Sequence, residues 1–336
     1  MDTANELQTT DLRIEKKRFS RIGFSYFIIA AVSIILQIVI ALLLNHFMPD
    51  YAQSNLIVYA ANLLPMYLIA IPIGFLLLRR LSIQKPEKHK LGVGTFFIFL
   101  IICISIMYLG NIVGTILTSV IGAISGRTIA NNVIDLVMGS NIYLNLIFVA
   151  ILAPIIEELL FRKLLIDRVY KYGEGVAIVT SGLMFGLFHG NFSQFFFAFG
   201  LGMIFAYIYC KTGRIRYSIG LHMFINTNGS VVAPLLLKNV NMAVLKSLET
   251  ASATAESNSV LYQALPGLIA FLAYGLIIFC VFVAGIILLI VFRKRITFAN
   301  GTVILPKGKR ASTMWLNVGM ILFSAVCLSM FVFSLL

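Results

Sequence analysis

Residues 153–165 read APIIEELLFRKLL, a stretch in which two adjacent glutamates and an arginine interrupt otherwise apolar sequence. An ionised carboxylate at the centre of a bilayer costs about 2.5 to 3.5 kcal/mol, so charges inside a membrane span are rare and usually functional. Glu157 and Glu158, with Arg162 about one helical turn later, are therefore the first candidates for a functional site.

The composition is that of an integral membrane protein. The 336 residues are 60% hydrophobic and only 12% charged, whereas a soluble domain carries about 25% charged residues. The net charge of +13 does not indicate a nucleic-acid partner, because Lys and Arg lie in short loops between apolar runs. The four cysteines lie in or beside apolar runs without CxxC spacing, which indicates neither a disulfide framework nor a zinc cluster.

The apolar runs predict an all-α fold, a polytopic transmembrane helix bundle of about eight or nine spans. Basic loops alternate with loops poor in Lys and Arg, which predicts a cytoplasmic N-terminus. We expect an integral protein of a bacterial cell membrane, retained by its first apolar run. The nine predicted spans are residues 22–44, 56–78, 94–121, 142–165, 176–189, 192–210, 218–237, 265–292 and 314–336.

Few ionisable residues lie within these spans, and the glutamate pair is the most informative. Glu158 and Arg162 are four residues apart, hence on one helix face, where an ion pair neutralises both charges. Glu157 is rotated by about 100° and is left without that partner. Glu157 is therefore predicted to be the carboxylate that is free to act as a general base. The alternative is a structural polar cluster that holds helices together.

Two histidines complete the buried ionisable set. Glu157 and His189 lie at equal sequence distances on either side of Gly173, so a hairpin that turns there brings them to the same depth. Phe185 and His189 share one helix face through their i,i+4 spacing. A hairpin at Gly173 therefore predicts that Glu157 and His189 face each other.

His222 and Asn226 also share a face, four residues apart in the span 218–237. If that span enters the membrane after Gly213, His222 lies shallower than Glu157, so a tilted or broken helix is required. Other intramembrane protease chemistries lack their residues here: the sequence has no HExxH, no Gly-x-Ser-x-Gly and no aspartate within a predicted span.

The pattern resembles a known family of intramembrane endopeptidases, the CPBP family (CAAX protease and bacteriocin-processing, or Abi). Its three motifs are matched, in order, by Glu157-Glu158-x-x-x-Arg162, Phe185-x-x-x-His189 and His222-x-x-x-Asn226. The resemblance implies a catalytic core at 141–237. The remaining divisions are a cytoplasmic tail at 1–21, transmembrane helices at 22–140, an extracytoplasmic loop at 238–264 and C-terminal transmembrane helices at 265–336.

The resemblance implies a role for each matched residue. Glu157 would activate a water with help from His189, and His222 and Asn226 would stabilise the oxyanion of the tetrahedral intermediate. The remaining matched residues would have orienting or structural roles beside the site: Glu158, Arg162 and Phe185.

No cofactor is expected for this chemistry, although zinc is the alternative that the residues permit. Zinc would require three protein ligands, and the sequence offers Glu157, His189 and His222. The metal-free reading is preferred because an asparagine suits an oxyanion better than it suits a zinc ion.

The predicted function is therefore cleavage of a peptide or membrane-protein substrate at the bilayer by an intramembrane endopeptidase of glutamic or metallo type. The first alternative is a catalytically silent membrane adaptor or regulator with the same fold. The second is a proton-coupled transporter, because buried Glu and His residues also relay protons. Inverted repeats, which many transporters contain, are not found in the sequence.

Overall fold

The computed structural model describes residues 11–240 and 255–336, and these two ranges contain helices and no strand. The predicted all-α bundle is confirmed. The helical segments up to the middle of the chain are α1 (Leu12–Phe47), η1 (Pro49–Gln53), α2 (Asn55–Leu64), η2 (Pro65–Ala70), α3 (Ile71–Leu78), α4 (Val93–Ser125), α5 (Asn132–Gly139), α6 (Ile142–Leu144), η3 (Asn145–Leu152), α7 (Ala153–Glu158), η4 (Leu159–Ile166), α8 (Asp167–Val169), η5 (Tyr170–Tyr172), α9 (Glu174–Phe188) and α10 (Phe192–Thr212). Those that follow are α11 (Ile215–Thr227), η6 (Asn228–Val232), α12 (Ala233–Lys238), α14 (Ala255–Phe292), η7 (Arg293–Arg295), η8 (Lys307–Lys309), α15 (Arg310–Trp315) and α16 (Val318–Phe333).

Each of the nine predicted spans corresponds to a helix or a run of consecutive helical segments. Within the described residues, six helices have the length and composition to cross a membrane, and α15 with α16, bent by 65°, would make a seventh. The segments from α6 to η5 form one such helix, Ile142–Tyr172. The other two predicted spans are α9, which has only 15 residues, and the run from α11 to α12.

Two predicted boundaries differ from the structure. Helix α1 begins at Leu12 rather than near residue 22, because the side chain of Asp11 caps it by accepting a hydrogen bond from the Arg13 amide at 2.9 Å. Helix α14 begins at Ala255, so residues 255–264 of the predicted loop are helical. That stretch contains neither Gly nor Pro, so nothing in it breaks a helix. Residues 1–10 and 241–254 of the predicted tail and loop lie outside the described residues.

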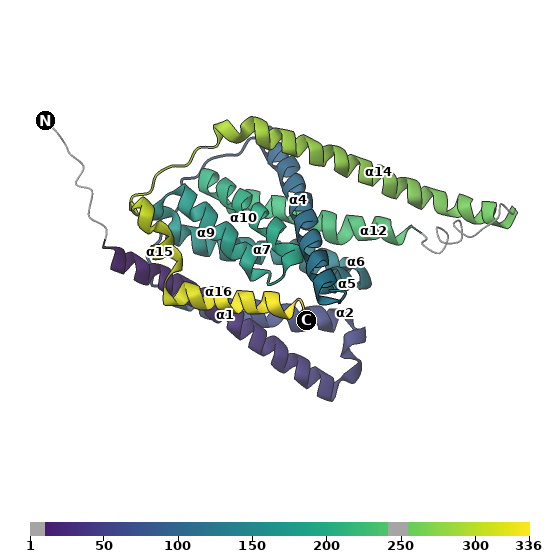
Figure 1. The fold of residues 1–336 in the computed structure, drawn as a ribbon, viewed down its shortest axis with the longest axis horizontal. Helices are drawn as coiled ribbons and strands as arrows, with labels where there is room; N and C mark the ends of the chain where they lie inside the picture. The colour runs from purple at the N-terminus through teal and green to yellow at the C-terminus, as the bar shows by residue number, and fades with distance from the viewer. Residues whose placement is uncertain (1–10, 241–254) are drawn as a thin grey trace.

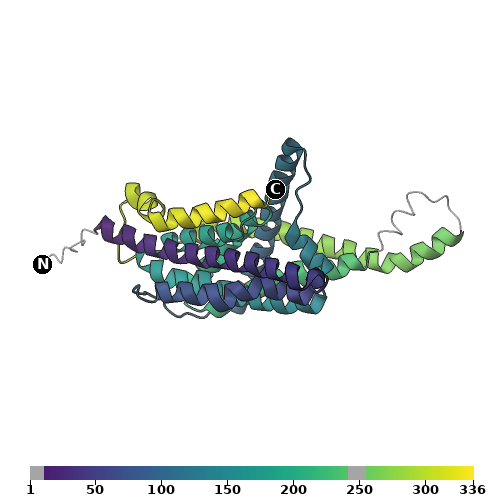
Figure 2. The same cartoon turned by 90° about the horizontal axis from the view of Figure 1, so that it is seen from below.

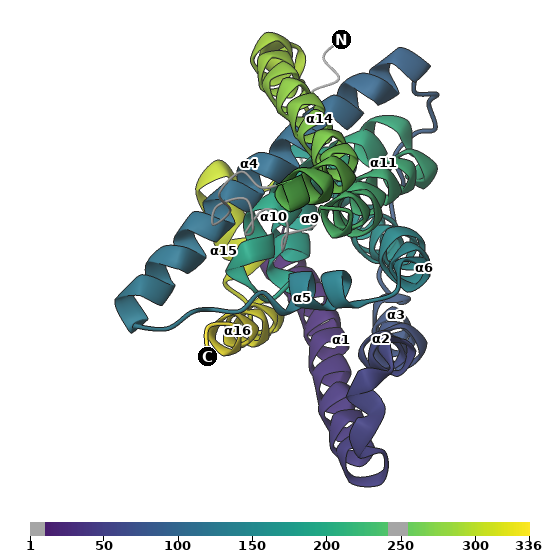
Figure 3. The same ribbon diagram turned by 90° about the vertical axis from the view of Figure 1, so that its right-hand side faces the viewer.

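The long helices surround a central group that carries the candidate site. Figure 1 shows α7, α9 and α10 in the middle, with α14 on one side, α1 and α16 on the other, and α4 running across from one side to the other. Figure 2 shows α1 and α16 running alongside each other, in agreement with their extensive contact. In Figure 3, α4 crosses the bundle obliquely and packs against both α10 and α14.

The crossing of α1 and α16 depends on two glycines. A Cβ placed on Gly319 would lie 2.6 Å from the Phe24 amide nitrogen, and one placed on Gly23 would overlap the backbone of Gly319 and Met320. Small residues at helix crossings let the backbones approach closely. The missing side chains at Gly23 and Gly319 therefore set the distance between α1 and α16.

The hairpin predicted at Gly173 is present, since α9 starts directly after it. Gly173 has a φ of 99°, a conformation that favours glycine. Its neighbour Glu174 donates its amide hydrogen to the Ala299 carbonyl at 3.0 Å and accepts a hydrogen bond from Lys211 Nζ at 2.5 Å. The turn is thus held by the segment that follows α14, and α9 returns antiparallel to the helix of the glutamate pair.

Candidate active site

The glutamate pair stands at the end of α7, a short α-helical stretch between two π-helical ones, η3 and η4. Pro154 lies at the start of α7 and has no amide hydrogen to continue an α-helical hydrogen-bond pattern. The same arrangement recurs at Pro234, which follows the π-helical η6. Such wide turns are frequent at functional sites. They interrupt two of the three helical runs that contribute to this site.

Glu158 and Arg162 form the predicted ion pair, and both side chains are completely buried. Arg162 Nε and Nη2 donate to the two carboxylate oxygens of Glu158 at 2.9 and 3.1 Å. Its third nitrogen, Nη1, donates to Ser181 Oγ at 2.6 Å. The guanidinium also lies over the rings of Phe185 and Phe205, 5.0 and 5.7 Å from their centroids. A carboxylate held by two hydrogen bonds from one arginine is unavailable as a base.

Glu157 points away from Arg162, as its helix phase predicted, and its side chain is 22% exposed. Its Oε2 lies 3.6 Å from Nε2 of His222. Glu157 is thus the carboxylate of the pair that faces open space within the bundle.

His222 contacts both glutamates, a bridge that the sequence did not reveal. Its Nδ1 lies 3.2 Å from Glu158 Oε1, while its Nε2 faces Glu157. A carboxylate only accepts hydrogen bonds, so Nδ1 carries a proton and Nε2 is the nitrogen left for chemistry. The ring stacks on Phe205, with centroids 5.1 Å apart. Phe205 and Ser181 are supporting residues that sequence reasoning missed, because each is an ordinary residue within a helix.

His189 lies at the C-terminal cap of α9, where its Nδ1 is 2.8 Å from the Phe185 carbonyl oxygen. Since a carbonyl oxygen only accepts, Nδ1 carries the proton and Nε2 is free. The edge-to-face contact with Phe185, 4.8 Å between centroids, fixes the orientation of the ring. Phe185 therefore packs beside the site as expected.

Asn226 lies one helical turn after His222 and reaches back to η3. Its Nδ2 donates one hydrogen to the Val149 carbonyl at 2.9 Å. A side-chain amide has two N–H groups, so the other remains for a ligand.

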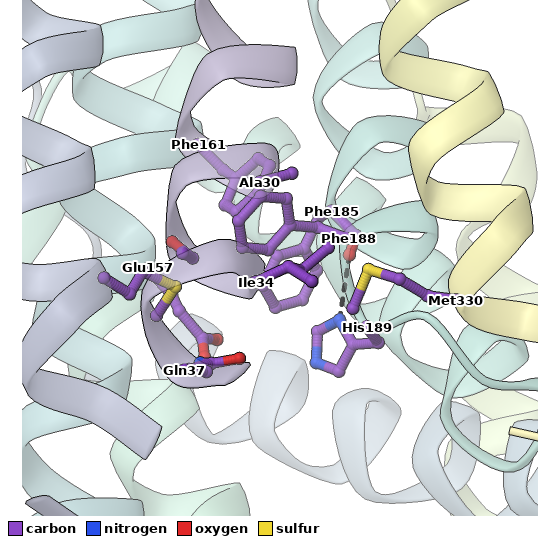
Figure 4. Close-up of a pocket in the computed structure, with 11 residues that line it drawn as sticks. Ala30, Ile34, Gln37, Glu157, Phe161, Phe185, Phe188, His189 and Met330 are labelled. Carbon is purple, nitrogen blue, oxygen red and sulfur yellow. Dashed lines mark hydrogen bonds between the residues drawn. The ribbon is translucent and has the colours of Figure 1, made fainter. Parts of the chain in front are cut away.

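The four predicted catalytic residues line one cavity of about 550 Å³, together with polar side chains of α4, α10 and the N-cap of α5. Those four residues are Glu157, His189, His222 and Asn226. A second cavity, of about 210 Å³, lies on the other side of Glu157, Phe185 and His189. Figure 4 shows Glu157 and His189 on opposite sides of this smaller cavity, with Met330 beside the histidine.

The alternative zinc site requires Glu157, His189 and His222 to meet at one ion, about 2.0 to 2.2 Å from each ligand atom. Within 11–240 and 255–336, no group of three His, Cys, Asp or Glu side chains is arranged to hold a metal ion. Glu157 and His222 are close together, and Nδ1 of each histidine is engaged by an oxygen. A zinc ion there would be held by Glu157 and by Nε2 of the two histidines, whose engaged Nδ1 atoms are typical of metal-ligating histidines.

Comparison with known proteins agrees with this geometry. Residues 139–228 match the family described as type II CAAX prenyl endopeptidase Rce1-like. The matched segment is thus similar to the CAAX protease family. It contains α7, α9, α10 and α11, and therefore the four predicted catalytic residues and the Glu158–Arg162 pair.

Two curated bacterial proteins resemble a longer stretch of the chain. The membrane-embedded CAAX protease MroQ of Staphylococcus aureus (strain USA300) is 27% identical over 194 residues, which cover 55% of this chain and 71% of that protein. The putative membrane peptidase YdiL of Bacillus subtilis (strain 168) is 28% identical over 147 residues, 44% of this chain and 59% of that protein. No solved structure matches the chain significantly. At this general level, the CAAX-protease segment is that of a membrane peptidase.

Proposed function

We propose that this chain is an intramembrane endopeptidase that hydrolyses a peptide bond with a water activated by Glu157. The observation that carries the proposal is the convergence of one free carboxylate, two histidines and one asparagine on a single cavity inside an apolar bundle. We infer that it acts on a peptide or membrane-protein substrate in a bacterial cell membrane, with its N-terminus in the cytoplasm. The basic loops and the bacterial relatives support this placement.

The proton positions support distinct roles for the two histidines. Nε2 of His189 carries no proton in the neutral ring and accepts a hydrogen bond from the attacking water. Both ring nitrogens of His222 face a carboxylate, a group that only accepts hydrogen bonds. In the proposed mechanism His222 donates a hydrogen bond from Nε2, and Asn226 donates one from its second amide hydrogen.

The reaction follows from these positions. The water oxygen forms a bond to the scissile carbonyl carbon, one water proton moves to the Glu157 carboxylate, and the carbonyl π electrons move to oxygen. His222 and Asn226 donate hydrogen bonds to this oxyanion. When it collapses, the C–N bond breaks and Glu157 passes its proton to the departing amine nitrogen. Glu158 and Arg162 do not touch the substrate, and they hold His222 in place.

The proposal is tested by comparing the peptide termini in membranes that contain the wild-type chain or its Glu157→Gln variant. Glutamine has nearly the shape of glutamate but cannot take the proton, so we expect the cleavage rate to fall by about 10²- to 10⁴-fold. Glu87→Gln is the matched control, because the Glu87 side chain is 90% exposed and far along the chain from the site. It should leave every product unchanged.

The adaptor alternative makes a different prediction for the same experiment. If Glu157→Gln reaches the membrane in the same amount as wild type and no peptide changes in length or abundance, the peptidase proposal is overturned. A partner-binding role that does not need Glu157 would then explain the family fold better.

A further inference from the structure

The two cavities meet at the catalytic residues but are built from different parts of the chain. Both are lined by Glu157, Phe185 and His189. The larger is formed mostly by α4, α5, α10 and α11, whereas the smaller is closed by α1, η2 and α16. None of these three closing elements belongs to the segment 139–228 that matches the family. The smaller cavity is therefore closed on one side by parts of the chain outside the catalytic core.

The lining of the smaller cavity, called here the α1–α16 pocket, is suited to an apolar group. Each of its two neutral polar side chains donates one hydrogen to a backbone carbonyl. Ser33 Oγ donates to the Ile29 carbonyl at 2.7 Å, and Gln37 Nε2 donates to the Asn62 carbonyl at 2.6 Å. The rest of the wall away from the catalytic residues is apolar: Ala30, Ile34, Met66, Phe161, Phe188 and Met330. Burying an unpaired polar group there would be costly, whereas burying an apolar one is favourable.

The size of the pocket limits the group that it holds. A cavity of about 150 Å³ lined by apolar side chains binds benzene, and this one measures about 210 Å³. One large side chain, such as Leu, Met or Phe, matches that volume. The larger cavity is about 550 Å³ and includes Asn111, Asn131 and Gln194 in its wall. Amide side chains there can hydrogen-bond to a peptide backbone.

We propose that the α1–α16 pocket receives the substrate side chain next to the scissile bond and selects a large apolar residue there. Ile34 and Met330 are its specificity-determining residues. The inference rests on the proposed peptidase function and adds a substrate class to it: peptides with a large apolar residue beside the cleaved bond.

Ile34 and Met330 are assigned this role because of where they lie. Both also line a groove of about 570 Å³ between α1 and α16, so they separate the pocket from that groove. Met330 lies against Gly190, the residue after His189, and a Cβ on Gly190 would be 2.7 Å from the Met330 Cε. Changing either side chain alters the depth of the pocket without touching Glu157 or His222.

The test uses two substitutions that change the pocket in opposite directions. Met330→Ala removes part of its far wall and should favour larger residues such as Trp, whereas Ile34→Phe fills it and should favour Ala or Val. The readout is the residue beside each new terminus whose formation requires Glu157. One methylene group more or less in an apolar pocket changes selectivity by about 10- to 200-fold. We expect the ratio of large to small residues to move by at least about tenfold, in opposite directions.

The controls separate this inference from the proposed function. Leu328→Ala and Val39→Phe make the same changes on the same two helices at residues that are 54% and 44% exposed and line neither cavity. They should leave the ratio unchanged. If Glu157-dependent termini form but Met330→Ala and Ile34→Phe leave their flanking residues as in wild type, the pocket assignment is overturned and the peptidase stands. If no terminus depends on Glu157, both proposals fail.

Discussion

The buried pair of Glu158 and Arg162 makes a quantitative prediction about stability. Both side chains are completely buried, and the arginine makes two of the hydrogen bonds that the carboxylate receives. Arg162→Met keeps the length and the apolar contacts of the side chain but removes its charge and all its donors. Glu158 would then keep the contact from Nδ1 of His222, at 3.2 Å, but neither hydrogen bond from the arginine.

Removing one partner of a buried ion pair costs about 3 to 5 kcal/mol, because the other charge is left uncompensated. The environment here is a bundle interior, where relief by water is small, so we expect Arg162→Met to lower the free energy of unfolding by that amount. Replacing both partners by neutral groups of similar shape is often nearly neutral. The double variant Glu158→Gln with Arg162→Met should therefore recover at least about 2 kcal/mol relative to Arg162→Met alone.

The assay is unfolding of the purified protein in mixed micelles titrated with a denaturing detergent, followed by helical circular dichroism. Arg80→Met provides the control, since Arg80 is an exposed residue after α3. Its loss should change the free energy by less than about 0.5 kcal/mol. The reasoning is refuted if Arg162→Met is as stable as the control, or if the double variant is no more stable than Arg162→Met.

Three further outcomes are expected. Asn226→Ala removes one oxyanion donor and should slow formation of the Glu157-dependent termini by about 10²- to 10³-fold at unchanged protein level. Asn145 makes hydrogen bonds to α2, α5 and η6 at 2.7, 2.8 and 3.0 Å, so Asn145→Leu should cost about 1 to 3 kcal/mol of unfolding free energy in the same detergent titration. Gly319→Ala places a methyl group against the backbone of α1 and should destabilise the protein by about 1 to 3 kcal/mol. Gly308→Ala, which meets open space, should leave that free energy unchanged.

Much of the fold and the centre of the site could be predicted, because each follows from a large free-energy cost or from geometry within a short stretch of sequence. Apolar runs of bilayer length predict helices because a backbone in lipid must satisfy its own hydrogen bonds. The turn at Gly173 and the pairing of Glu158 with Arg162 follow from short-range geometry, and the structure contains both. The start of α14 was placed ten residues too late, because a polar helical extension has no apolar pattern to mark it.

The contact between His222 and Glu158 could not be predicted from the sequence, because it depends on how two distant helices pack. The two residues are 64 positions apart and meet at 3.2 Å, and their approach depends on how α11 crosses the helix of the glutamate pair. The π-helical turns of η3 and η4 on either side of α7 also change the phase of that helix relative to a regular one. A depth estimate that assumes straight α-helices therefore placed His222 too shallow to predict this contact.

The residues proposed to perform chemistry and those proposed to select a substrate differ in how easily they are recognised in the sequence. A buried glutamate is conspicuous, since its cost in a membrane demands an explanation. Ile34 and Met330 carry no such cost, because an apolar side chain lining a pocket has the same character as one that faces lipid. Only the packing of α1 and α16 against the family core distinguishes them. Substrate preference in this protein is therefore expected to change through apolar substitutions in its outer helices while Glu157, His189 and His222 stay the same.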